Sequence, residues 1–197
     1  MKTHKTFFKQ VAELGFLLMM GLAMTACGAG NKKWKEEVQL NDGKVIVVER
    51  ESIYESGGDE WASNRSGTKI KAYHIRFPNP DKSGKMIEWR TTKIDPFTYP
   101  EIPLVLDMEA GKPVVYSLVA ISAGCEVYSK YVYQNSEWGW TDVTLPEQFE
   151  QHTTNLLFGS KKDAPSLIKL QEKYKRNDEP GYRNALKQIG PNLKVCG

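Results

Sequence analysis

The side chains best suited to catalysis or metal binding are few in this chain of 197 residues and lie far apart. Of its three histidines, His4 lies in the basic N-terminal segment, and His74 and His152 are widely separated. No His-x-x-x-His or Glu-x-x-His spacing joins either of them to a second ligand, so a zinc site would need long-range convergence. We therefore expect no metal and no other cofactor, with His74 on the solvent side of a strand and His152 in a loop.

Sequence motifs for nucleophilic or phosphate chemistry are also missing. The chain contains no Gly-x-Ser-x-Gly turn and no glycine-rich phosphate loop. Cys125 follows a glycine, but a catalytic thiol needs a nearby base, and none can be identified for it. The carboxylates are scattered and form no evident acid–base pair. The sequence therefore predicts no catalytic residue.

A different chemistry, lipid attachment, is indicated near the N-terminus. Lys2, Lys5 and Lys9 form a basic segment, and residues 14–26 are an uncharged run rich in Leu, Met, Ala and Gly. This run is too short to span a bilayer, which takes about 20 apolar residues. It fits the apolar part of an export signal. The alternative is a buried amphipathic helix with an incidental cysteine, but such a helix would lack a polar face here.

Residues 23–28, Ala-Met-Thr-Ala-Cys-Gly, resemble the lipobox of bacterial lipoproteins. The resemblance implies that residues 1–26 are a signal peptide and that Cys27 becomes the first mature residue, acylated with palmitate or similar chains. Met24 departs from the Leu that is commonest at its position. Several acyl chains hold a protein firmly at a membrane, whereas one binds only marginally. In a host with two membranes, Gly28 in place of Asp favours the outer membrane, with the protein facing the periplasm or the surface of the cell envelope.

The charge of the mature chain is nearly balanced. Removal of residues 1–26 leaves 24 basic and 23 acidic side chains of the original 27 and 24. No strongly basic field remains to recruit nucleic acid. The remaining residues, about 170, suit one domain. We expect residues 27–33 to form an acylated tether and residues 34–197 to form a single β-rich domain.

Two further cysteines, Cys125 and Cys196, remain once Cys27 is acylated. An even number of cysteines in an oxidising compartment favours a disulfide. We predict a bond between these two that holds the C-terminal tail against the domain, and the chain-entropy account gives it about 4 kcal/mol of stabilisation. The alternative is a pair of free, buried cysteines.

Strand–turn–strand patterns dominate the domain. Turn residues separate apolar-rich runs in four places: Asp42-Gly43, residues 78–84, residues 109–112 and Asn135-Ser136. In the run before residue 78 the alternation places Lys71, Tyr73, Ile75 and Phe77 toward the core. Residues 51–66 are polar and predict a long, exposed loop.

Helical spacing begins after Asp163, which can cap a helix with Pro165 in its first turn. We expect a small α-helical segment over about residues 163–190. Hairpins followed by helices predict a mainly β fold, an antiparallel sheet or sandwich with a helical C-terminus and α+β overall. A blade-like or meander arrangement ranks below it.

Trp138 and Trp140 are two residues apart and share one face of a predicted strand. With Tyr131 and Tyr133 they form a candidate binding strip for a glycan or a peptide, because aromatic side chains anchor ligands and partners. The alternative is that these rings pack in the core.

Residues 34–50, the Gly57-Gly58 loop and residues 131–138 resemble a group of uncharacterised bacterial envelope proteins. That resemblance implies no activity and supplies no catalytic residue. The expected function is that of a lipid-anchored, non-catalytic module that binds an envelope protein or glycan. Two alternatives stay open, namely a hydrolase of cell-wall material and an accessory lipoprotein encoded by a phage or plasmid. A pocket with His74 beside two carboxylates would favour the hydrolase, and an exposed aromatic strip would favour binding.

Overall fold

A computed structural model describes residues 30–56, 68–80, 83–92, 100–121, 125–143, 154–157, 159, 166–177 and 194–195. The predicted signal peptide, Cys27, His152 and Cys196 lie outside the described residues, as does most of the predicted helical segment. No helix within the described ranges is long and apolar enough to cross a bilayer.

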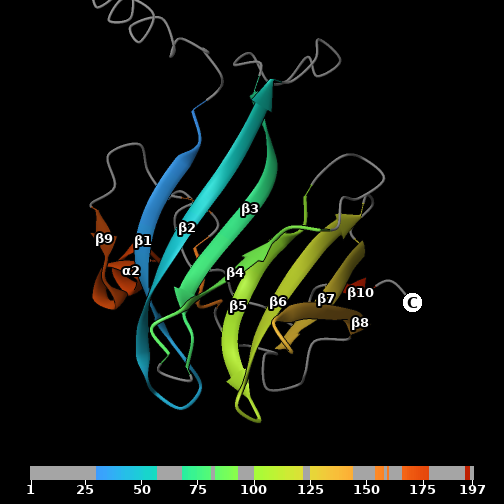
Figure 1. Cartoon of the computed structure of the whole chain (residues 1–197). Coiled ribbons are helices and arrows are strands. Elements are labelled where there is room, and N and C mark those ends of the chain that lie inside the picture. The colour runs from blue at the N-terminus through green and yellow to red at the C-terminus, as the bar shows by residue number, and fades with distance from the viewer. Residues whose placement is uncertain are drawn as a thin grey trace, which may run out of the picture.

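Two sheets make up the body of the protein (Figure 1). The first contains, in spatial order, β4 (Met86–Arg90), β3 (Thr68–Pro78), β2 (Val45–Ser56), β1 (Lys32–Gln39) and β9 (Leu167–Ile168). The second contains β10 (Lys194–Val195), β7 (Cys125–Gln134), β6 (Lys112–Ile121) and β5 (Ile102–Glu109), and β8 (Glu137–Val143) also pairs with β7. One short helix, α2 (Leu170–Asn177), lies beside β1. The mainly β fold with a small helical end is therefore confirmed.

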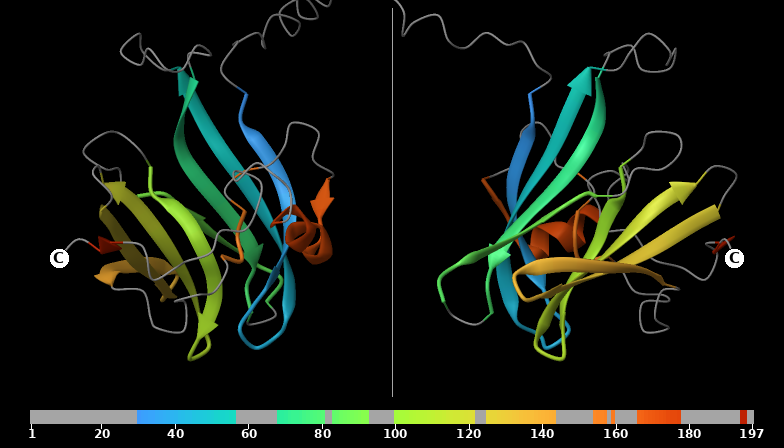
Figure 2. Two further views of the ribbon diagram at one scale, coloured as in Figure 1. Left: turned by 180° about the vertical axis from the view of Figure 1, so that it is seen from behind. Right: turned by 45° about the vertical axis from the view of Figure 1, so that its right-hand side comes forward.

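All four predicted hairpins are present, and their turns gather at one end of the two sheets (Figures 1 and 2). Two of these turns contain two residues each, Ala110-Gly111 and Asn135-Ser136, and all four residues have positive φ. This backbone matches the right-handed twist of paired strands. Because β1 runs from Lys32 toward its turn, the start of β1 lies at the opposite end (Figure 1).

The main core lies between the facing sheets. Tyr73, Ile75 and Phe77 are buried in it, as the alternation predicted. Lys71 is exposed instead. The register of β2 and β3 shifts between Ile53 and Tyr54, so that no residue of β2 lies directly opposite Lys71. A bulge of this kind turns the strand, so Ile70 takes the core-facing place.

Both open sides of this sandwich are tied by side chains. On one side, Asn155 accepts a hydrogen bond from the backbone N–H of Leu106 (2.9 Å) and donates to the carbonyls of Leu106 (2.7 Å) and Gln39 (3.1 Å). Its amide thus replaces a strand partner at the edge of β5 and reaches across to β1. On the other side, the indole N–H of Trp138 donates to the carbonyl of Glu88 at 2.6 Å, which joins β8 to β4.

Three expected boundaries are corrected. The predicted loop over residues 51–66 is wrong for its first part, because β2 continues to Ser56 through pairing with β3. The predicted helix begins at Leu170 and not near Asp163, because Leu167–Ile168 pair in parallel with β1 and Ile168 packs with Trp34 and Leu157. Strand β1 already begins at Lys32, within the expected tether.

Candidate binding site

His74 lies between two carboxylates on the outer face of the first sheet. Its Nδ1 is 3.5 Å from Glu51 Oε2, and its Nε2 is 3.4 Å from Glu88 Oε2. The imidazole is on the predicted face of β3, but neighbouring side chains leave only 6% of the residue exposed. The two ring nitrogens point to different carboxylates, so they do not converge on one reacting atom.

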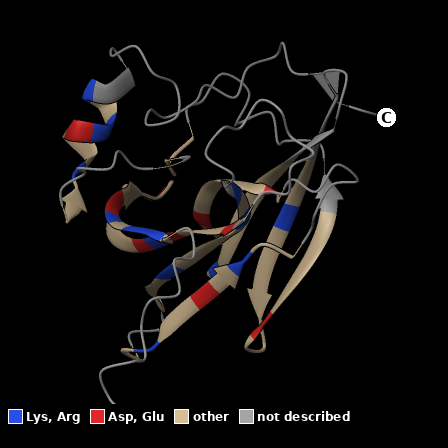
Figure 3. Ribbon diagram, turned by 90° about the horizontal axis from the view of Figure 1, so that it is seen from above, with Lys and Arg blue, Asp and Glu red and all other residues tan. Residues whose placement is uncertain are grey.

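The carboxylates around His74 belong to a larger network of ion pairs. Arg76 contacts both Glu88 Oε1 (2.8 Å) and Glu49 Oε2 (3.1 Å), and Lys35 contacts Glu49 at 2.8 Å. The hydrogen bond from Lys35 lowers the pKa of Glu49, so this carboxylate is ionised at neutral pH. Basic and acidic segments lie next to one another on the strands (Figure 3). Such cross-strand pairs stabilise a sheet face.

Metal ligation has no support among the described residues. Within these ranges, no group of three or more His, Cys, Asp or Glu side chains is arranged to hold a metal ion.

A second ionic cluster is buried on the inner face of the first sheet. Glu36 Oε1 accepts a hydrogen bond from Arg50 Nη1 (2.7 Å), and its Oε2 accepts one from the backbone N–H of Leu157 (3.1 Å) and lies 2.7 Å from Lys173 Nζ. Lys173 also donates to the carbonyl of Glu37 at 2.8 Å. We call Glu36, Arg50 and Lys173 the buried triad. It connects α2 to β1 and β2 and therefore holds this helix on the first sheet.

A third buried polar group centres on Glu101. Its carboxylate accepts hydrogen bonds from the hydroxyls of Tyr131 (2.7 Å) and Ser117 (2.7 Å) and from the backbone N–H of Thr92 (2.9 Å). The Tyr131 ring also packs edge-on against Trp89, with the ring centroids 5.4 Å apart. These contacts place Tyr131 in the core, where only 1% of the residue is exposed.

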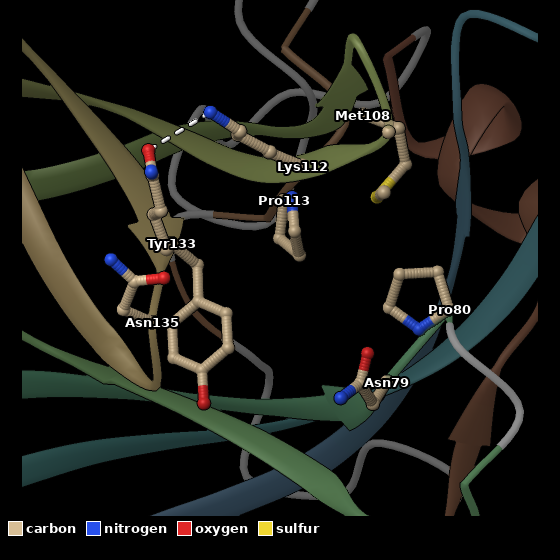
Figure 4. Close-up of a pocket in the computed structure, with 9 residues that line it drawn as sticks. Asn79, Pro80, Met108, Lys112, Pro113, Tyr133 and Asn135 are labelled. Carbon is tan, nitrogen blue, oxygen red and sulfur yellow. Dashed lines mark hydrogen bonds between the residues drawn. The ribbon is translucent and has the colours of Figure 1, made fainter.

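The turns of the β3–β4, β5–β6 and β7–β8 hairpins surround a surface hollow of about 500 Å³ (Figure 4). We call it the turn-end hollow. Its lining residues are Asn79, Pro80, Met108, Gly111, Lys112, Pro113, Tyr133, Gln134 and Asn135.

The hollow combines apolar walls with side-chain amides. The Tyr133 ring lies near Pro113, and Pro80 with Asn79 lies across the opening (Figure 4). Lys112 Nζ donates to Gln134 Oε1 at 2.9 Å, so the ammonium group contacts the amide of a neighbouring lining residue. Apolar walls with a few placed polar groups are typical of small-ligand sites.

The four residues of the predicted strip share one sheet face but differ in exposure. Tyr131 pairs with Trp140 and Tyr133 with Trp138 across β7 and β8, which confirms that the two indoles point alike. The Trp138 ring lies 5.1 Å from Tyr133 and is half-buried, whereas 51% of Trp140 is exposed. Because Tyr131 is buried, only Tyr133, Trp138 and Trp140 of this strip are accessible to a ligand.

The remaining predicted residues are the cysteines. Cys125 begins β7, and β10 pairs in parallel with it so that Lys194 is opposite Cys125. Cys196 follows two residues later in the sequence and, like Cys27, lies outside the described residues. The disulfide and the acylation therefore stay predictions.

Sequence reasoning missed most of the turn-end hollow, including Asn79, Met108 and Lys112. These residues flank turns that are distant in the sequence. The order of the hairpins could nevertheless have indicated this grouping, because the turns of successive hairpins in an up-and-down sheet lie at the same end of the sheet. The comparisons with known proteins add nothing to this site, because no protein family, no curated protein and no solved structure matches the chain.

Proposed function

We propose that this protein is a lipid-anchored component of a bacterial cell envelope and that it binds another envelope component through its hairpin end. The supporting observation is the position of the turn-end hollow, which lies at the end of the sandwich opposite to Lys32. The tether from Cys27 joins the domain at Lys32. An anchor at Cys27 therefore directs the hollow away from the membrane.

The dimensions suit this orientation. The five peptide steps from Cys27 to Lys32 reach at most roughly 17 Å, so the start of β1 is held close to the membrane. Strand β1 then extends for eight residues, or about 26 Å, toward the turns. A component of the envelope can thus reach the hollow without contacting the lipid surface.

The lining of the hollow suits recognition. Its polar residues lie at the ends of paired strands and in the hairpin connections beside them, and supports on paired strands hold a binding geometry better than long loops. Its apolar side chains supply area that a ligand can cover. Trp140 adds an exposed aromatic ring on the neighbouring strand.

A hydrolase of cell-wall material is the second candidate, favoured by one observation, the position of His74 between Glu51 and Glu88. The ion pairs around these groups and the burial of His74 support a structural role instead. Incubation of isolated cell walls with the protein and its His74→Ala variant separates the two. Release of wall fragments by the parent protein alone would establish the hydrolase.

Site-specific photocrosslinking in the native host tests the binding proposal. A photoreactive residue replaces Asn135 at the hollow in one variant and Lys71, exposed near the opposite end of β3, in the matched control. We expect the Asn135 variant to give a discrete crosslinked product that the Lys71 variant lacks. Equal yields of the same products from both positions, or no product from either, would contradict the proposal.

A further inference from the structure

Tyr133 connects the turn-end hollow to the aromatic residues of β8. Tyr133 lines the hollow, and its ring packs against Trp138 with the centroids 5.1 Å apart. Trp140 follows on the same face of β8, roughly 6.6 Å further along the strand. Because half of Trp140 is exposed, a ligand that fills the hollow can extend over this indole.

The polar groups of the hollow suit a ligand that donates and accepts hydrogen bonds at many points. Asn79 and Asn135 each carry an amide, which has two donors and an acceptor, whereas the Gln134 amide is bonded to Lys112. Sugar hydroxyls have the same dual character. The C–H groups on a sugar ring also pack against the negative face of an aromatic ring, as at Tyr133 or Trp140.

An extended peptide fits the hollow itself less well. Its backbone N–H and C=O groups need partners, and proteins usually supply them from an open strand edge. The described lining residues of the hollow belong to the hairpin turns and to the ends of β5, β6 and β7, and these strands already pair with one another. At the nearby edge of β4, the Glu88 carbonyl is already bonded to Trp138. Lys112 is the one charged residue of the described lining and contacts Gln134, so the surface has no set of charges to match a charged peptide.

We propose that the turn-end hollow and Trp140 form one extended site for a glycan chain. One sugar unit lies in the hollow among the amides, and the chain continues over Trp138 to Trp140. This inference rests on the proposed binding function and names the class of its ligand.

Titration of the full-length acylated protein in detergent tests the inference. The probes are a hexamer of N-acetylglucosamine and a hexamer of glucose, with a proline-rich peptide as the competing class. Tryptophan fluorescence and calorimetry report binding. We expect at least one hexamer to bind and the peptide not to bind.

Three variants locate the site. Trp140→Ala removes the exposed indole, and Asn135→Gly removes an amide while keeping a residue that tolerates the positive φ of 52°. Tyr174→Ala is the matched control, because Tyr174 is an aromatic residue of similar exposure (47%) on α2. We expect about tenfold weaker binding for the first two, the loss typical of an important contact residue, and unchanged affinity for the control.

The outcomes distinguish this inference from the proposed function. If neither hexamer binds at about 1 mM, a level that would detect even a weak complex, the glycan inference is wrong. If Asn135 nevertheless crosslinks to an envelope protein in the host, binding at the hairpin end stands with a protein partner. Equal affinity of the Trp140→Ala and Tyr174→Ala variants would show that the site does not extend along β8.

Discussion

Replacing Glu36 with Gln is expected to destabilise the fold severely. Glu36 is fully buried and is the acidic member of the buried triad, in contact with Arg50 and Lys173 at 2.7 Å each. The neutral amide would leave two cations buried beside each other. Removal of one partner from a buried ion pair typically costs about 3–5 kcal/mol, a large part of the 5–15 kcal/mol that ordinarily stabilises a domain.

Replacing Lys173 with Met has a different consequence. The variant retains Glu36 and Arg50 as a neutral pair, but the carbonyl of Glu37 loses its Lys173 donor. We expect a loss of about 1–3 kcal/mol, the usual cost of an unsatisfied buried polar group. In the double variant, Lys173→Met also removes one of the two cations that Glu36→Gln left unbalanced. Its cost should therefore be smaller than the sum of the two single costs by about 1–3 kcal/mol.

The assay is urea denaturation of the parent, both single variants and the double variant, followed by tryptophan fluorescence. The same double-mutant comparison with Arg50→Met in place of Lys173→Met tests the ion pair between Glu36 and Arg50. If the two single costs add to the cost of the double variant within about 0.5 kcal/mol, Glu36 and Lys173 act independently and do not form a buried ion pair that stabilises the fold.

The alkaline pH dependence gives a second readout of the same triad. Burial lowers the pKa of Lys173 below its ordinary value, although Glu36 acts in the opposite direction. The folded protein therefore binds this proton less tightly than the unfolded chain, so stability rises with pH between the lowered and the ordinary pKa. The parent should gain stability relative to Lys173→Met over that interval, and a constant difference would contradict the shift.

Three further predictions concern separate parts of the fold. Burial raises the pKa of Asp107, whose Oδ2 is buried and lacks a hydrogen bond among the described residues, so ionisation destabilises the fold. Asp107→Asn should raise the urea midpoint at pH 7, with a gain that shrinks as the pH falls through the raised pKa; an equal gain at all pH values would refute this. Ala110 has a φ of 46°, so Ala110→Gly should stabilise the β5–β6 turn by about 1 kcal/mol in thermal unfolding, and an unchanged midpoint would show that Ala110 is not strained. Thiol counting in denaturant without reductant should find neither Cys125 nor Cys196 reactive in the mature protein, and two reactive thiols would exclude the disulfide.

The local elements of the fold were predictable where a turn or an alternation is unambiguous. Asp42-Gly43 predicted a hairpin because glycine tolerates the positive φ that such a turn requires, and Gly43 has a φ of 83°. The alternation of Tyr73, Ile75 and Phe77 predicted their burial. It failed at Lys71, because a bulge depends on the pairing of two strands and leaves little trace in either one alone.

Features that depend on distant contacts were not predictable. Glu36, Arg50 and Lys173 resemble ordinary surface charges in the sequence, and only the docking of α2 on the sheet buries them together. Leu167 and Ile168 fit a helical spacing, but pairing with β1 makes them a strand. For the candidate site, the shared face of Trp138 and Trp140 followed from their spacing, whereas the partial burial of Trp138 depends on its contacts with Phe77 and Glu88 on the other sheet.

The mass of the mature protein, purified from the membranes of its own host, tests the proposed anchor most directly. We expect a chain that begins at Cys27 and carries acyl chains on that residue, and the Cys27→Ala variant should lose both membrane association and acyl mass. A mature chain that retains residues 1–26, or one that is cut elsewhere and carries no acyl chain, would contradict the anchor and the outward orientation of the turn-end hollow.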